Sequence, residues 1–140
     1  STLTELAGEK PQAPCHGRSL IPLLSGSEEP DDWPQSAFCE FHGSHMGLYS
    51  MRLLTTEKFA YVYHTNDIDE LYDRTADPWQ LTNVASDPNY ASILSRLKRE
   101  MIQWMANTGD HLHNEWTVDW LSDGDQTLMA EAPGRRKTKW

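Results

Sequence analysis

The stretch that decides the fold is MRLLTTEKFAYVYH, Met51 to His64, which is followed after a short turn by ELYD, Glu70 to Asp73. Alternate positions fall on common faces: Met51 with Leu53, and Phe59 with Tyr61 and Tyr63. The segment TTEK between the two halves is typical of a turn. This pattern predicts an antiparallel hairpin, with ELYD as a further short strand beside it.

The segments on either side of this hairpin complete a fold. SAFCEF, residues 36–41, alternates loosely and suits another strand, while Asp87 and Pro88 are favourable residues for the start of a helix and Gly109 for its end. One apolar stripe at helical spacing runs between them: Tyr90, Ile93, Leu94, Leu97, Met101, Trp104 and Met105. We therefore predict an α+β fold, a small four-stranded antiparallel sheet packed by one long C-terminal helix, with an extended tail.

The domain boundaries follow from these elements. We expect one subdomain over residues 1–109, with a connecting segment at 1–36, the sheet at 37–73 and the helix at 87–107, and then an extended tail or arm at 110–140. STLTELAG at the start of the chain resembles the end of a helix, which leads us to expect that a longer protein precedes it. EWTVDWL, residues 115–121, suits a short strand or an arm packed on a neighbour.

Charge limits the classes of partner. The chain carries 12 basic and 21 acidic residues, a net charge of −9, which argues against binding to nucleic acid or to an anionic membrane surface. No window approaches the length of apolar sequence that spans a bilayer, about 20 residues. The basic residues of the last six positions are interpreted as a solvated tail.

The stretch CEFHGSH, Cys39 to His45, concentrates residue types that carry chemistry. His42 and His45 are spaced H-x-x-H, but a loop containing Gly lacks the fixed geometry of a zinc-binding helix. Cys15 and Cys39 are too few for a disulfide framework, and we expect two buried thiols. The residues alone predict no metal site and no complete catalytic set in this chain.

The order of the motifs resembles a known family. STLTELAG followed by HGRSLIPLLSG is similar to the segment after the catalytic core of type I sulfatases, in the alkaline phosphatase superfamily. The run from Met51 to Tyr90 resembles the C-terminal subdomain of the same family, with its hairpin, Glu-Leu-Tyr-Asp, Asp-Pro, Thr-Asn and helix. The resemblance covers residues 1–109. It departs after Asp77-Pro78, where Trp79 and Gln80 replace a turn that often carries Gly or Glu.

This resemblance implies an enzyme whose catalytic residues lie elsewhere. Type I sulfatases hydrolyse sulfate esters with a formylglycine, made from Cys or Ser in a Cys/Ser-x-Pro-x-Arg motif, and with calcium or magnesium. The sequence contains no such motif: Cys15 precedes His16-Gly17-Arg18, and Cys39 precedes Glu40-Phe41-His42. The chain is therefore expected to be inactive alone, with an N-terminal catalytic domain as its partner and no catalytic or metal-binding residue of its own.

The resemblance also gives CEFHGSH a role. The corresponding family segment lies where the C-terminal subdomain meets the catalytic domain, so Glu40, His42 and His45 are candidates for the rim of a pocket for a sulfated small molecule or sugar. The alternative is that they only stabilise the loop. A second hypothesis for the whole chain is a standalone structural or interaction module that keeps the fold without catalysis. The tail, with Trp116 and Trp120, would then serve a homo-oligomer or another partner.

Overall fold

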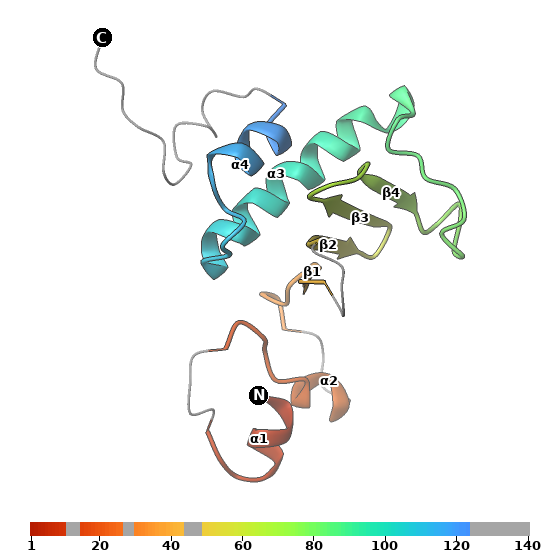
Figure 1. The fold of residues 1–140 in the computed structure, drawn as a ribbon. Coiled ribbons are helices and arrows are strands. Elements are labelled where there is room, and N and C mark those ends of the chain that lie inside the picture. Colours follow the sequence, from red (N-terminus) through yellow and green to blue (C-terminus); the bar gives the residue numbers. More distant parts are fainter. Residues whose placement is uncertain (11–14, 27–29, 44–48, 124–140) are drawn as a thin grey trace. The chain divides into compact units, whose positions relative to one another are not determined.

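The structure is a computed structural model that describes residues 1–10, 15–26, 30–43 and 49–123. The chain divides into two units, one of residues 1–34 and one of residues 35–140. Each unit is described by itself below, and the positions of the elements within each can be followed in Figure 1.

The N-terminal unit holds two short helices, α1 (Thr2–Leu6) and α2 (Ile21–Leu24). Thr2 Oγ1 accepts a hydrogen bond from Leu20 N at 2.9 Å, which joins the two helices. Arg18 donates to the carboxylate of Asp32 at 2.6 Å, and this exposed pair keeps the pKa of Asp32 below its ordinary value through that hydrogen bond. Neither helix contains a buried residue, so this unit has no core of its own among its described helical residues.

The C-terminal unit contains a four-stranded antiparallel sheet, in the sequential order β1-β2-β3-β4 (Figure 1). Its strands are β1 (Ser36–Phe41), β2 (Met51–Thr56), β3 (Phe59–His64) and β4 (Glu70–Asp73). Thr56 closes the central hairpin, because its hydroxyl accepts from Phe59 N at 3.0 Å. The predicted hairpin and the short fourth strand are confirmed.

The long helix is preceded by a 3-10 turn, η1 (Pro88–Tyr90), and continues as α3 (Ala91–Thr108). Asp87 starts the turn, and its side chain accepts a hydrogen bond from Asn89 N, so the predicted capping role is confirmed. Gly109 ends α3 in the left-handed conformation at φ 67°, which glycine adopts without a Cβ penalty. No helix within the described residues combines the length and apolar character needed to cross a lipid bilayer.

The core lies between one face of the sheet and α3. The side chains that fill it are Leu54, Tyr61, Tyr63, Leu71, Leu97, Met101, Ile102, Met105, Val118 and Leu121. β1 packs on the same helix through Phe38, whose ring stacks on the ring of Trp104 with 5.5 Å between the centroids. Ser36 adds a hydrogen bond to Glu100 of 2.6 Å. The α+β architecture with one packed helix agrees with the sequence-based expectation.

The segment after α3 differs from that expectation. Residues 115–121 form a helix, α4 (Glu115–Leu121), where a short strand or an arm was predicted. Asn114 caps it by accepting hydrogen bonds from the backbone of Trp116 and Thr117, and Val118 and Leu121 complete the core on one side. Trp116, Val118 and Trp120 alternate in the sequence as they would in a strand, and the Asn114 cap was the signal that favoured a helix. Residues 124–140 of the predicted tail lie outside the described chain.

The connection from β4 to α3 is tied by polar side chains. Asn83 Oδ1 accepts from Leu71 N at 3.0 Å and from Ala85 N at 2.9 Å, while its Nδ2 donates to Asp69 O at 3.1 Å. Asp77 Oδ2 accepts from two further backbone amides, those of Leu81 and Thr82, at 2.7 and 2.8 Å. These bonds hold a loop on which Trp79 and Leu81 are both more than four-fifths exposed.

Candidate functional site

Two of the three predicted rim residues meet at the end of β1. Glu40 is in the strand and His42 lies just beyond it, and Glu40 Oε2 is 3.1 Å from His42 Nε2. Both side chains are half exposed, so both can reach a ligand. His45, the third residue, lies outside the described residues.

The structure adds a residue that the sequence did not single out for this site. The ring of His111, which follows α3, lies 4.9 Å from the ring of His42, measured between centroids. In the sequence, His111 stands 69 positions after His42. The close approach depends on the tertiary packing of α3, which no local pattern reveals.

A buried ion pair joins the strand beside Glu40 to the segment that carries His111. Arg52, opposite Glu40 in the strand register, donates from Nε and Nη2 to the two carboxylate oxygens of Asp110 at 2.5 and 2.8 Å. Both side chains are fully buried. Burial raises the pKa of Asp110, but the hydrogen bonds from Arg52 and from Leu112 N outweigh that effect, and the pKa lies below its ordinary value. The pair fixes the start of the segment that carries His111.

The cysteines differ from the prediction. Cys15 and Cys39 are free thiols, and both are exposed rather than buried. Cys39 alternates with Phe38 and Glu40 along β1, so it points to the sheet face opposite α3, on an edge strand. Within the described ranges, no group of three or more His, Cys, Asp or Glu side chains is arranged to hold a metal ion. The described residues therefore do not fit the divalent cation that the sulfatase resemblance implies.

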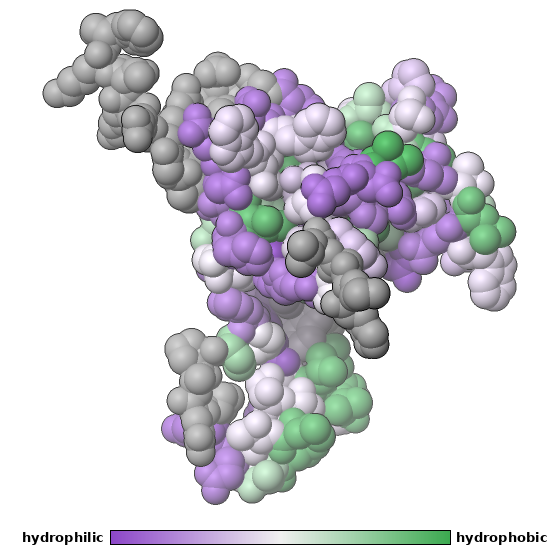
Figure 2. Space-filling view, viewed as in Figure 1, coloured by the Kyte–Doolittle hydropathy of each residue, from purple (hydrophilic) through white to green (hydrophobic). Residues whose placement is uncertain are grey.

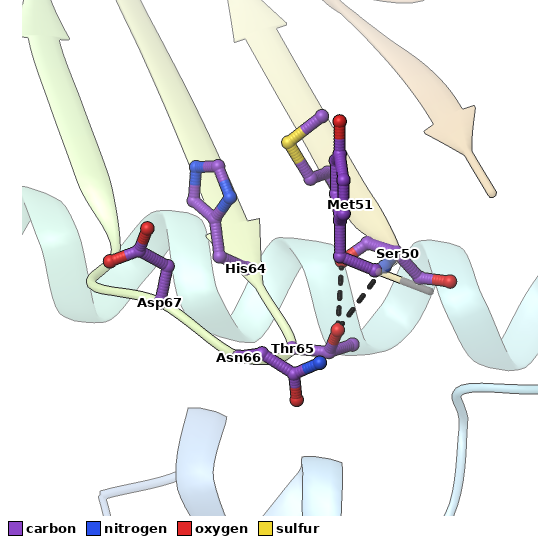
Figure 3. Close-up of a pocket in the computed structure, with 7 residues that line it drawn as sticks. Ser50, Met51, His64, Thr65, Asn66 and Asp67 are labelled. Atoms are coloured by element: carbon purple, nitrogen blue, oxygen red, sulfur yellow. Dashed lines mark hydrogen bonds between the residues drawn. The ribbon is translucent and has the colours of Figure 1, made fainter. Parts of the chain in front are cut away.

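A pocket of about 400 Å³ opens at the end of the sheet where β2 begins and β3 ends (Figure 3). Its lining is formed by Tyr49, Ser50, Met51, His64, Thr65, Asn66 and Asp67. Ser50 and Thr65 are joined by hydrogen bonds of 3.1 and 3.2 Å through the Thr65 hydroxyl, drawn as dashed lines in Figure 3. These bonds join the start of β2 to the end of β3, while Met51 and His64 extend to the same side of the sheet from neighbouring strands.

His64 belongs to a polar chain across the open face of the sheet. Its Nε2 lies 3.1 Å from Glu70 Oε1, and the other oxygen of Glu70 accepts from the Tyr72 hydroxyl at 2.6 Å. That hydrogen bond, together with burial and the charge of Glu70, raises the pKa of Tyr72 to about 12. Tyr72 therefore stays a hydrogen-bond donor at neutral pH, and it orients Glu70 towards His64.

The same face carries apolar side chains. A pocket of about 380 Å³ is lined there by Cys39, Glu40, Phe41, Met51, Leu53, Val62, His64 and Glu70. Phe41 is 38% exposed, although it stands in a strand. In the part of the chain that the structure describes, α3 covers only the other face of the sheet.

A family model for the C-terminal part of N-sulphoglucosamine sulphohydrolase matches residues 1–107. An ulvan-active sulfatase from Formosa agariphila is 26% identical over 141 residues, which cover 79% of this chain and 28% of the relative. An N-acetylglucosamine-6-O-sulfatase from Bacteroides thetaiotaomicron is 28% identical over 138 residues, covering 91% of this chain and 24% of the relative. The chain thus spans about a quarter of the length of these relatives.

A solved structure is also similar to this chain over most of its length. A putative sulfatase from Bacteroides thetaiotaomicron superimposes with a TM-score of 0.70 and 26% identity, covering 91% of this chain and 27% of that structure. The match thus extends over both the helical connection and the sheet with its helix. The chain belongs to the family described by the C-terminal domain of N-sulphoglucosamine sulphohydrolase, within the sulfatases of the alkaline phosphatase superfamily.

Proposed function

We propose that this chain is the C-terminal subdomain of a sulfate-ester hydrolase and that the reaction takes place in a longer protein. The observation that carries the proposal is the family match over residues 1–107, combined with relatives about four times as long. The formylglycine and the calcium or magnesium ion that the resemblance implies would come from the part of that protein outside these 140 residues.

The first role of the subdomain is to brace the catalytic portion. Five leucines of the N-terminal unit are exposed: Leu3, Leu6, Leu20, Leu23 and Leu24. Figure 2 shows hydrophobic side chains gathered over this unit, while the visible face of the C-terminal unit is mainly hydrophilic. A group of exposed apolar side chains of this kind is characteristic of an interface. The open sheet face around Phe41 and Leu53 supplies a second such surface. We assign both surfaces to contact with the catalytic portion.

The second role is at the rim of the substrate pocket. Glu40 and His42, with His45 three positions further along the sequence, would contact the organic part of a sulfated substrate. Their half-exposed side chains and the nearby ring of His111 support this assignment. Imidazoles can donate hydrogen bonds to sulfate or sugar oxygens and gain positive charge as the pH falls.

The test is the release of sulfate by the longer protein that contains this segment. We expect hydrolysis of an O-sulfated monosaccharide such as N-acetylglucosamine 6-sulfate, and faster turnover of 4-nitrophenyl sulfate than of the phosphate and phosphonate analogues. Preference for the phosphate or phosphonate ester would assign the protein to another branch of the superfamily. No hydrolysis of any ester would favour a structural module that keeps the fold without catalysis.

A further inference from the structure

The outer side of α4 carries two exposed indoles with a carboxylate beside them. Trp116, Asp119 and Trp120 are spaced at i, i+3 and i+4, so they lie on one side of the helix. Trp116 is 83% and Trp120 is 61% exposed, while Val118 and Leu121 on the opposite side are buried in the core. The two indoles take no part in that core. We call the group Trp116, Asp119 and Trp120 the α4 stripe.

Negative charge surrounds the α4 stripe. Among the described residues, the carboxylate of Asp119 makes no hydrogen bond or ion pair. Asp67 lines the hollow next to Trp120. Asp123 follows α4, and its carboxylate is 56% exposed although it pairs with Lys98. Flat aromatic rings beside carboxylates suit a guanidinium group, which stacks on an indole and pairs with a carboxylate at the same time.

The chain itself contains a segment of matching chemistry directly after this helix. Residues 124–140, which lie outside the described ranges, contain four of the 12 basic residues but only two of the 21 acidic ones. The basic residues are Arg135, Arg136, Lys137 and Lys139. The rest of the chain is therefore more acidic than the net charge of −9 suggests, and the two parts are complementary in charge.

The length of this segment allows the basic residues to return to the helix. Its starting point is fixed, because Lys98 Nζ of α3 lies 2.9 Å from Asp123 Oδ1. Twelve positions separate Asp123 from Arg135, a length of chain that reaches at most about 40 Å, whereas the two indoles are only about 6 Å apart along the helix axis. The dipeptide at 133–134, Pro-Gly, is typical of a turn. Attachment through so short a linker gives an effective concentration of about 1 mM.

We propose that the basic run Arg135, Arg136 and Lys137 binds the α4 stripe of the same molecule. A guanidinium group lies over an indole face and pairs with Asp119. This contact gives the basic run a partner, where the sequence alone led us to expect a solvated tail. It also covers the exposed rings of α4. The proposal is independent of sulfate hydrolysis, because it concerns residues outside the candidate rim and needs no substrate.

The test is fluorescence anisotropy of a labelled peptide of residues 124–140, titrated with the native polypeptide that contains these 140 residues. In that polypeptide, the triple change Arg135→Ala, Arg136→Ala and Lys137→Ala vacates the α4 stripe. We expect the triple variant to bind the peptide with a dissociation constant of about 100 μM at about 20 mM salt, and more weakly at higher salt. The unsubstituted polypeptide should bind it at least about threefold more weakly, because its own basic run competes.

Matched substitutions in the triple variant locate the contact. Trp116→Ala with Trp120→Ala should weaken binding of the peptide about tenfold, since each cation–π contact contributes a factor of about three. Asp119→Asn removes the carboxylate without shortening the side chain and should weaken binding about threefold. The controls are Trp79→Ala, an 82% exposed indole on another loop, and Glu57→Gln, an exposed carboxylate on the hairpin turn. Both should leave the affinity unchanged, and circular dichroism checks that all variants fold.

Four outcomes contradict the proposal. Equal affinity of the triple variant and the unsubstituted polypeptide means that the basic run does not occupy α4 in the native molecule. An effect of Trp79→Ala as large as that of the α4 changes means that the peptide binds without selecting the α4 stripe. Absence of binding to the triple variant means that another part of the polypeptide covers the indoles. A dimer that the triple change dissociates, seen by light scattering, assigns the basic run to a second copy.

Discussion

Arg52 on the second strand and Asp110 after the long helix are joined by two parallel hydrogen bonds of 2.5 and 2.8 Å, and both side chains are fully buried. The pair crosses from the sheet to the segment that carries His111, which lies against His42. An isolated buried charge is costly, so each residue depends on the other. The ion pair thus links the stability of the fold to the geometry of the candidate rim.

Removing one partner should destabilise the chain strongly. Arg52→Met leaves the Asp110 carboxylate buried without its guanidinium, and we expect a loss of about 3–5 kcal/mol in the free energy of unfolding. The double variant Arg52→Met with Asp110→Leu removes both charges and should recover a large part of the loss. Urea unfolding followed by tryptophan fluorescence measures both. A double variant no more stable than Arg52→Met would show that the pair is not coupled in this way.

The same pair predicts acid sensitivity. Because the pKa of Asp110 in the folded chain lies below its ordinary value of 3.8, the stabilisation from its ionised form is complete above that value. It is lost as the pH falls through the folded pKa. Asp110→Asn should therefore show a flatter dependence of unfolding free energy on pH than the parent chain between about pH 4 and pH 2. Identical slopes for the two proteins would contradict the assignment.

Asn83 should stabilise the connection from β4 to α3. Asn83→Ala removes one acceptor that serves two backbone amides and one donor to Asp69 O, and we expect a loss of about 1–2 kcal/mol. Asn89→Ala is the control, since the bond made by Asn89 comes from its backbone amide and survives the change. Thermal unfolding compares the two variants, and equal midpoints would refute the role given to Asn83.

The rim residues should act on substrate affinity. In the longer protein, His42→Ala and His111→Ala are expected to raise KM for a sulfated sugar about tenfold, because a charge-assisted hydrogen bond is lost, with little change in kcat. Turnover of 4-nitrophenyl sulfate, which lacks the sugar, should change little. His16→Ala provides an exposed histidine in the other unit as a control. If kcat/KM stays unchanged for all sulfated substrates, the rim assignment is wrong.

Local patterns predicted the elements of the fold because each carries its own signal. The strands alternate, the long helix repeats at 3.6 residues, and Asp87 and Gly109 mark its ends. The α4 helix was missed because seven residues allow either period, and only Asn114 distinguished them. The prediction that Cys39 is buried was wrong, because one face of this edge strand is left uncovered.

The candidate site was only partly predictable. Glu40 and His42 are neighbours in sequence, so their contact needs nothing beyond the end of one strand. His111, Arg52 and Asp110 join them through contacts that span 58 to 69 positions, which depend on how α3 packs on the sheet. The position of Arg52 did contain a signal for a buried ion pair. Arg52 lies on the same face of β2 as Leu54, which faces the core, and a charge buried there requires a partner.

The most direct test of the central claim is peptide mass mapping of the native protein purified from its source, together with its intact mass. The account predicts that peptides of this chain belong to a polypeptide of several hundred residues, and that this polypeptide carries a formylglycine in an upstream Cys/Ser-x-Pro-x-Arg motif. A native polypeptide of 16.0 kDa with no such residue would contradict it.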